Sequence, residues 1–337
     1  WFVSRLLIID HACAKAFEVF TVQNNGTRHE AIRDSGKDVI NRLLQKAMPT
    51  RQRTRSPASL PDDWTPDVSI EEYVSRIGEI QSRIARGELQ QAILSIGLSR
   101  KSTADANAVF EVLRRRNASP HVFLVRTEQS TLVGASPAMH LRKNGKVLTV
   151  ETDAGTRRVG DTEEATRVIM EELLHSPKDL AEQRMIVDET IVGLKLIAAG
   201  GEVSVPIDLE VRRLGNVMHL FTVLQAQIKD ELSPVQAVLS CFPPSAVTGA
   251  PRRNAMQVIK DVERRSRGPY GGVLGLIGFD ESVDTAIILR SAWTEGDQIA
   301  MRCGGGITDA SVPADEYAEC MNKARAMIEC VREAETL

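Results

Sequence analysis

Two pairs of acidic residues stand three positions apart in segments that the sequence predicts to be helical. Asp179 and Glu182 lie near the start of one segment, and Glu316 and Glu319 near the start of another. This spacing places both carboxylates of a pair on one helix face, so four would converge if the two faces meet. Their repulsion would then require a cation, and oxygen donors without paired His or Cys favour Mg²⁺ over Zn²⁺. The simpler alternative is that these residues only complement the helix dipoles.

Three consecutive glycines, Gly304, Gly305 and Gly306, directly follow a predicted strand. Without side chains they would let backbone N–H groups approach an anion such as a carboxylate or a phosphate. A tight turn at the end of the strand is the plainer alternative. The triplet is therefore a candidate anion site.

Three further side chains are of types that bind or catalyse. Arg290 ends an apolar strand and would need a carboxylate partner if it points inward. Tyr270 lies in a turn rich in glycine, which would hold its phenol rigidly. His219 lies between apolar strand residues and could act as a general acid or base only if it faces a cleft. Each of the three could equally belong to the core.

The elements that must position these groups do not alternate strictly between strand and helix. Helices are predicted at residues 69–87, 162–174, 177–199, 234–241, 254–262 and 314–333, the first with a capping box from Ser69 to Glu72. Strands are predicted at residues 91–97, 122–125, 131–134, 147–151, 217–228, 273–279, 285–290 and 299–302. This order disfavours a parallel doubly wound sheet and predicts an α+β fold with antiparallel strands.

The chain divides into three predicted regions. Residues 1–47 begin with two predicted strands near 6–11 and 17–22. Residues 48–67 contain four prolines and three arginines with few large apolar side chains, which predicts a linker. Residues 68–334 form the main domain. The chain begins at Trp1 and not at Met, which predicts that further residues precede it.

Composition excludes several broad classes of protein. Lys and Arg total 42 and Asp and Glu total 45 among 337 residues, a net charge of −3 that argues against a nucleic-acid binder. No apolar run approaches the length of a membrane helix, and no signal peptide is visible. The five cysteines are odd in number and contain no CxxC pair, which predicts free thiols in a reducing, cytoplasmic compartment.

Several segments resemble motifs of the chorismate-utilising enzymes. They include FP at 242–243, VTGAP at 247–251, AM at 255–256, RGPYGG at 267–272 and DTAI at 284–287. PKDLAEQRMIVD at 177–188, the glycine triplet and EYAECMNKARA at 316–326 also match. The matches follow the order of the family from about residue 70 to residue 330. The chain most resembles anthranilate synthase large subunits, and next to them 4-amino-4-deoxychorismate synthase.

The resemblance implies an α+β fold in which two antiparallel sheets form a sandwich flanked by helices. It places the chorismate-binding catalytic domain at residues 68–334. By matched position, Glu182 and Glu319 are the implied Mg²⁺ ligands, with Asp179 and Glu316 beside them. The cofactor that the resemblance implies is therefore the same Mg²⁺ that the acidic spacing suggests.

The resemblance also assigns substrate contacts. Thr248 matches a threonine that contacts the substrate, His219 a histidine linked to pyruvate elimination, and Lys323 a lysine near the metal. The groups implied to bind the carboxylates of chorismate are Tyr270, Arg290 and the amides of Gly304, Gly305 and Gly306.

Two positions separate the reactions within the family. Relatives that add water carry a lysine base where Gln91 stands, and a neutral amide cannot deprotonate water, so isochorismate and salicylate synthesis are disfavoured. Relatives that aminate C4 carry a nucleophilic lysine where Ala154 stands. Ala154, followed by Gly155 and Thr156 at the implied substrate site, therefore favours amination at C2.

The resemblance implies Mg²⁺-dependent amination of chorismate at C2, then pyruvate elimination to anthranilate, as in tryptophan biosynthesis. A separate glutamine amidotransferase subunit would supply the ammonia. Departures from the family pattern, at Ala138, Asp153, Gln183 and residues 189–193, leave a second reaction open that stops at 2-amino-2-deoxyisochorismate. A chorismate-binding module without catalysis is the alternative from a different functional class, and retention of the four acidic residues argues against it.

Overall fold

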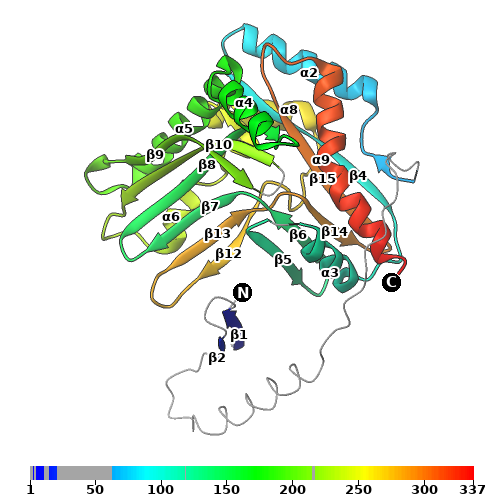
Figure 1. Ribbon diagram of the computed structural model, residues 1–337, viewed down its shortest axis with the longest axis horizontal. Coiled ribbons are helices and arrows are strands. Elements are labelled where there is room, and N and C mark those ends of the chain that lie inside the picture. Colours follow the sequence, from blue (N-terminus) through cyan, green and yellow to red (C-terminus); the bar gives the residue numbers. More distant parts are fainter. Residues whose placement is uncertain (1–2, 4, 11–14, 21–62, 118, 215–216) are drawn as a thin grey trace. The chain divides into compact units, whose positions relative to one another are not determined.

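The computed structural model describes residues 3, 5–10, 15–20, 63–117, 119–214 and 217–337 (Figure 1). The chain forms two compact units, residues 1–59 and residues 60–337. In the first unit, β1 (Arg5–Asp10) and β2 (Lys15–Phe20) pair as an antiparallel hairpin, which confirms the two predicted leading strands. The rest of the predicted leading region and most of the predicted linker lie outside the described residues.

The second unit contains a six-stranded antiparallel sheet. Its centre is a long strand pair, of which one strand extends to residue 158 where only 147–151 was predicted, and the other matches the predicted 217–228 to within one residue. In spatial order the strands are β12 (Val273–Ile277), β13 (Val283–Ile287), β7 (Met139–Asn144), β8 (Val147–Arg158), β10 (Val217–Gln227) and β9 (Ser204–Leu214).

A seven-stranded antiparallel sheet completes the β-structure that the model describes. The short β3 (Thr65–Pro66) pairs with β4 outside the main order. That order is β11 (Gly249–Ala250), β4 (Gln91–Lys101), β15 (Gln298–Ile307), β14 (Ser291–Glu295), β6 (Thr131–Ser136) and β5 (His121–Arg126).

Helices flank both sheets (Figure 1). Against the six-stranded sheet lie α4 (Glu163–Leu174) and α5 (Pro177–Ile197), with α6 (Pro234–Ser240) on α5. Against the seven-stranded sheet lie α2 (Ile70–Ala85), α3 (Ala106–Arg116), α8 (Arg252–Glu263) and α9 (Pro313–Ala334). The short α7 (Ser245–Thr248) contacts α8, and the 3-10 helix η1 (Ala199–Gly201) follows α5. The predicted α+β fold with two antiparallel sheets flanked by helices is confirmed.

The first long helix shows how local sequence sets the packing. The Ser69 side chain accepts a hydrogen bond from the Glu72 amide at 3.2 Å, which caps α2 as predicted. Tyr73, Ile77 and Ile80 recur at helical spacing and are fully buried, so one stripe of α2 enters the core beside α9. The apolar stripe of α2 therefore helps to fix α9, which carries Glu316 and Glu319, within the core.

Two predicted bounds are wrong. The glycine triplet lies inside β15 and not after a strand, because its backbone pairs with β4 although it carries no side-chain pattern that would announce a strand. Residues 63–67 belong to the second unit and not to the linker, since Trp64 is buried and Asp67 accepts a hydrogen bond from the Gly97 amide at 2.8 Å. The main domain therefore begins several residues before 68. The sequence patterns also did not predict α3, β7, β9 and β14.

Cys241, Cys303, Cys320 and Cys330 carry buried free thiols, as predicted, whereas Cys13 lies outside the described residues. Within the part of the chain that the structure describes, no helix combines the length and the apolar character that crossing a bilayer requires.

His140 predicts a loss of stability in acid. Its side chain is buried beside Thr285, with 3.1 Å between Nδ1 and Oγ1, and burial lowers the pKa of the imidazole from 6.5 to about 4. The unfolded chain therefore takes up the proton first, and stability present above pH 6.5 falls as the pH drops towards 4. We expect His140 to contribute about 2 kcal/mol to the difference in unfolding free energy between pH 7 and pH 5.

Urea unfolding at both pH values measures this difference. His140→Gln should flatten the pH dependence by that amount, whereas His175→Gln, which removes an exposed histidine, should not. An unchanged slope in His140→Gln would contradict the assignment.

Candidate functional site

The two acidic helix starts come within electrostatic reach of each other. Glu182 lies in the second turn of α5, and Glu319 lies in the second turn of α9. Burial raises the pKa of Glu182, and the charges of Asp179 and Glu319 raise it further, while Gln91 and Lys323 oppose this. The structure thus brings carboxylates of two distant segments within electrostatic reach of Glu182, an approach that the spacing had left conditional.

Each of these carboxylates has a protein partner. Gln91 Nε2 donates to Glu182 Oε1 at 3.4 Å, and Lys323 Nζ pairs with Glu319 Oε1 at 2.7 Å. Further hydrogen bonds, whose donor and acceptor are given in that order, join Arg157 to Asp179 at 2.6 Å and Ser311 to Glu316 at 2.7 Å. Gln91 and Lys323 therefore contact Glu182 and Glu319, the two candidate metal ligands. Arg157 is a neighbour of this cluster that the sequence did not suggest.

The donor chemistry fits a hard divalent cation. Burial raises the pKa of Glu316, and the charge of Glu319 raises it further. Both effects disfavour the charged carboxylate, and a bound cation would offset them. Their oxygens are the donors that Mg²⁺ prefers. Among the residues that the structure describes, however, no three acidic, His or Cys side chains already form a complete metal-ligand set. Glu182 and Glu319, from two helices, are the residues that would hold the ion.

The glycine triplet is where three site side chains approach a strand backbone. A Cβ added to Gly304 would lie 2.7 Å from the Tyr270 hydroxyl, and one on Gly305 would lie 3.1 Å from Glu316 Oε2. A Cβ on Gly306 would lie 2.4 Å from Gln91 Nε2. Since β14 pairs with β15 only along residues 298–301, one edge of the triplet has no strand partner among the described strands. Amides at such an edge can bind an anion.

Gly304→Ala is predicted to damage both activity and stability. The new methyl group would lie 2.8 Å from the Leu94 carbonyl oxygen as well as against Tyr270, so the backbone of β4 or β15 must shift. We expect a loss of about 1–3 kcal/mol in unfolding free energy together with a large loss of turnover.

Gly78→Ala is the matched control, because nothing lies within 4 Å of its added Cβ on α2. That variant should keep the activity of the parent and melt at a slightly higher temperature, because Ala favours the helix over Gly by about 1 kcal/mol. A fully active Gly304→Ala would show that the close approach at the triplet is unimportant.

His219 is placed by an irregularity between β8 and β10. It pairs with Thr156, the next residue Leu220 pairs with Ala154, and Gly155 is the extra residue between them. Gly155 has φ of +61°, a value that favours glycine. A Cβ added to Gly155 would lie 2.9 Å from Asp179 Oδ1, so the backbone here closely approaches that carboxylate. Thr156 Oγ1 lies 3.1 Å from His219 Nδ1. The segment predicted to bind substrate therefore joins the acidic cluster to the histidine.

Arg290 lies between β13 and β14 with φ of +45° and keeps an exposed side chain. Neighbouring protein atoms lower the pKa of its guanidinium and Asp153 raises it, but arginine stays charged at any ordinary pH. The predicted carboxylate-binding cation thus faces a fixed acid, Asp153.

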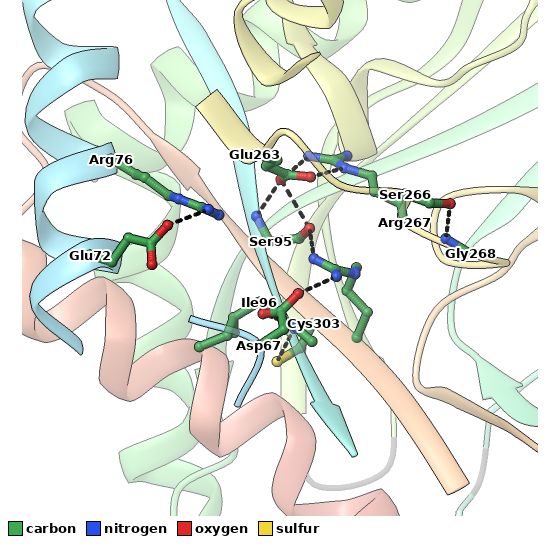
Figure 2. Close-up of polar contacts among 12 residues, drawn as sticks. Asp67, Glu72, Arg76, Ser95, Ile96, Glu263, Ser266, Arg267, Gly268 and Cys303 are labelled. Carbon is green, nitrogen blue, oxygen red and sulfur yellow. Dashed lines mark hydrogen bonds and ion pairs between the residues drawn. The ribbon is translucent and has the colours of Figure 1, made fainter. Parts of the chain in front are cut away.

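A buried ion pair between Glu263 and Arg267 (Figure 2) lies beside Thr248 and Tyr270. Glu263 accepts from the Ser95 amide at 2.8 Å and from Arg267 Nη2 at 2.6 Å. Arg267 also donates to the Val247 carbonyl at 2.7 Å, next to Thr248, and its guanidinium lies 5.8 Å from the centre of the Tyr270 ring. A groove of about 780 Å³, lined in part by Thr248, Tyr270 and Gly271, opens beside them.

The sequence did not suggest that Glu263 and Arg267 support the site. Their spacing of four residues was no usable signal, because α8 ends at Glu263 and Arg267 lies in the turn beyond it, so their contact depends on the path of that turn. The sequence identified Asp153 only as a departure from the family pattern. The residues next to it in the chain gave no sign that it would lie near His219 and Arg290.

Comparison with known proteins bears on this site as a whole. Residues 1–329 match the family model of the chorismate binding enzymes. Anthranilate synthase component 1 of Geobacillus stearothermophilus is 34% identical over 267 residues, which are 79% of this chain and 53% of that protein. The chain therefore spans about half the length of that relative.

Solved structures share the fold. Anthranilate synthase component I from Streptococcus pneumoniae TIGR4 superposes with a TM-score of 0.85 at 25% identity, over 96% of this chain and 72% of that one. MenF, the menaquinone-specific isochorismate synthase from Escherichia coli, superposes with a TM-score of 0.75 at 23% identity, over 94% and 71%. The second likeness concerns the fold alone.

Proposed function

The chain belongs to the family of chorismate binding enzymes, and on that premise we propose that it adds ammonia to C2 of chorismate and then eliminates pyruvate to give anthranilate. The observation that carries the choice is the environment of Glu182, which is bonded to the neutral amide of Gln91. A lysine base for water is missing from that position. Ammonia is already a nucleophile and needs no such base. The relatives named anthranilate synthase component 1 support the same choice.

Chorismate carries two carboxylates, and the site offers two kinds of group for them. Arg290 supplies a permanent positive charge, and Tyr270 supplies a phenol whose pKa burial keeps well above neutral pH, so it donates a hydrogen bond. The backbone of residues 304–306 supplies amides at an unpaired strand edge. Held in this way, the substrate would place its ring between the acidic helix starts and His219.

In the amination step, the nitrogen lone pair of ammonia forms a bond to C2, the ring double bonds shift, and the C4–OH bond breaks with loss of water. Mg²⁺ held by Glu182 and Glu319 would offset the negative charge of the ring carboxylate and of the departing oxygen. Lys323 donates to the Gly304 carbonyl at 3.0 Å and pairs with Glu319. It would therefore hold the Glu319 carboxylate in position beside the glycine triplet.

In the elimination step, a base removes the proton at C2, and the C–H electron pair becomes a ring double bond. The C3–O bond breaks, and the departing enolpyruvate takes up a proton to become pyruvate. His219 is the proposed carrier of this proton, since burial lowers the pKa of its imidazole and keeps it a neutral base. Aromatisation of the ring drives the step.

A glutamine amidotransferase subunit is the proposed source of ammonia, because a named component 1 implies a further component. We also propose a cytoplasmic location, which the free thiols of the described cysteines support. Neither a nucleic acid nor a membrane is a proposed partner.

One incubation tests the proposal. The protein is mixed with chorismate, Mg²⁺ and an ammonium salt at alkaline pH, and the products are separated and measured by anthranilate fluorescence. Anthranilate with an equal amount of pyruvate supports the full reaction. A non-fluorescent aminated product supports the shorter reaction that stops at 2-amino-2-deoxyisochorismate. Unchanged chorismate in the presence of a binding signal would overturn the enzyme proposal in favour of a binding module.

A further inference from the structure

The extra residue at Gly155 decides which β8 side chains lie near His219. Residues paired across an antiparallel ladder share a face of the sheet, so Thr152 and Thr222 lie on the same face. Helix α5 covers this face, and its Gln183 donates to both threonine hydroxyls. After the extra residue, Arg157 lies on that same covered face and reaches Asp179 on α5. The alternation of β8 is therefore shifted by one residue at Gly155.

The opposite face of β8 and β10, away from α5, is called the inner face here; it carries Glu151, Asp153, Thr156, His219 and Phe221. On an unbroken strand, Asp153 and Thr156 would point to opposite faces because they are an odd number of residues apart. The shift at Gly155 puts both on the inner face, on either side of His219. Two oxygen-bearing side chains thus flank one ring nitrogen.

The distances agree with this placement. His219 Nδ1 lies 3.1 Å from Thr156 Oγ1 and 4.0 Å from Asp153 Oδ2. The first distance is a hydrogen bond, and the second is a charge contact that a small movement of either side chain would close. Nδ1 is therefore the nitrogen engaged by the protein, which leaves Nε2 for the substrate.

Asp153 lies between one permanent cation, Arg290, and an imidazole, His219, that becomes cationic when it takes up a proton. Desolvation raises the pKa of the Asp153 carboxyl group, while His219 and Arg290 both lower it. The Asp153 carboxylate therefore interacts electrostatically with both of these side chains. A substrate carboxylate bound by Arg290 would neutralise that guanidinium. Once substrate is in place, the imidazolium that His219 forms on taking up a proton would then be the cation that Asp153 faces.

We propose that Asp153 is a positioning residue for the elimination step: with Thr156 it holds His219 by the Nδ1 side, so that Nε2 faces C2 of the aminated intermediate. Its negative charge stabilises the imidazolium that forms when His219 takes the C2 proton, and this stabilisation ends when the proton passes to the departing enolpyruvate. The role rests on the proposed function. Amination does not use His219, so only the second step depends on Asp153.

Asp153→Asn tests the role, because it keeps the size of the side chain and removes the charge. We expect amination to proceed at the parent rate and elimination to slow by about 10–100-fold, so the aminated intermediate accumulates relative to anthranilate. The readouts are the ratio of the two products by chromatography and the separate kcat and KM for chorismate. Asp153→Glu should restore part of the parent ratio, which a merely structural role would not predict.

Glu151→Gln is the matched control, since it removes a carboxylate from the same strand and face, opposite Val223 and away from His219. It should leave the product ratio unchanged. If Asp153→Asn keeps the parent ratio, the positioning role is wrong and the proposed function stands. If the parent protein makes only the aminated product, the role is overturned while amination stands. If the parent makes neither product, the proposed function fails and the role with it.

Discussion

Glu319→Ala is expected to reduce chorismate turnover by at least about a thousandfold, equivalent to about 4 kcal/mol of transition-state stabilisation. The variant removes one of the two carboxylates that would hold Mg²⁺. The fold should survive, because the Glu319 side chain is 55% exposed and its ion-pair partner is the nearby Lys323. Steady-state rates with excess Mg²⁺, together with circular dichroism and a melting curve, separate the two effects.

Glu329→Ala is the control for this variant. Glu329 lies on the same helix, about 15 Å further along by helical rise, and pairs with Arg116 at 3.0 Å on the surface. Its loss should change neither activity nor fold. Turnover near the parent level in Glu319→Ala would remove the metal-ligand assignment and with it the shared role of the two helix starts.

Glu263→Ala is expected to produce the largest loss of stability, about 3–5 kcal/mol. Glu263 is 1% exposed, and its removal would leave the Arg267 guanidinium without its acidic partner and the Ser95 amide without its acceptor. Activity should fall as well, since Arg267 holds the carbonyl next to Thr248. Chemical unfolding measures the first effect, and rates measured well below the melting temperature measure the second.

An exposed ion pair provides the comparison. Glu164 pairs with Arg167 at 2.6 Å, but its side chain is 72% exposed, so Glu164→Ala should cost less than about 1 kcal/mol. Equal losses of unfolding free energy in Glu164→Ala and Glu263→Ala would show that burial does not increase the contribution of the Glu263–Arg267 ion pair to stability.

The sequence predicted the elements of this fold better than their pairing. Helix starts at Pro177 and near Pro313 follow from proline at the first turn and from the apolar stripes, and the structure has both. The interior position of residues 304–306 in β15 was not predictable, because glycine carries no side chain from which strand periodicity could be recognised. Tertiary pairing with β4 alone makes that segment a strand.

The spacing showed that the carboxylates of the two acidic helices could converge if the helices met, but it did not indicate their neighbours. Arg157 reaches Asp179 only because β8 shifts its alternation at Gly155, and no local pattern encodes a register. For the same reason the sequence could name Asp153 as unusual without indicating which ring it would approach. Contacts between separate strands depend on tertiary pairing, which single-segment patterns do not contain.

The extra residue at Gly155 also constrains how this chain can diverge. If Gly155 were drawn into the ladder, β8 would become an unbroken strand, and Thr156 and Arg157 would exchange the sides to which they point. Loss of the irregularity at unchanged chain length would thus remove the basic partner of Asp179 and the hydroxyl beside His219 together. Deleting Gly155 would instead keep both side chains on their present faces, because Thr156 would then follow Ala154 directly in the ladder. A saturation library that includes length changes should therefore tolerate this deletion better than a large side chain at position 155, which would meet Asp179 and Leu173.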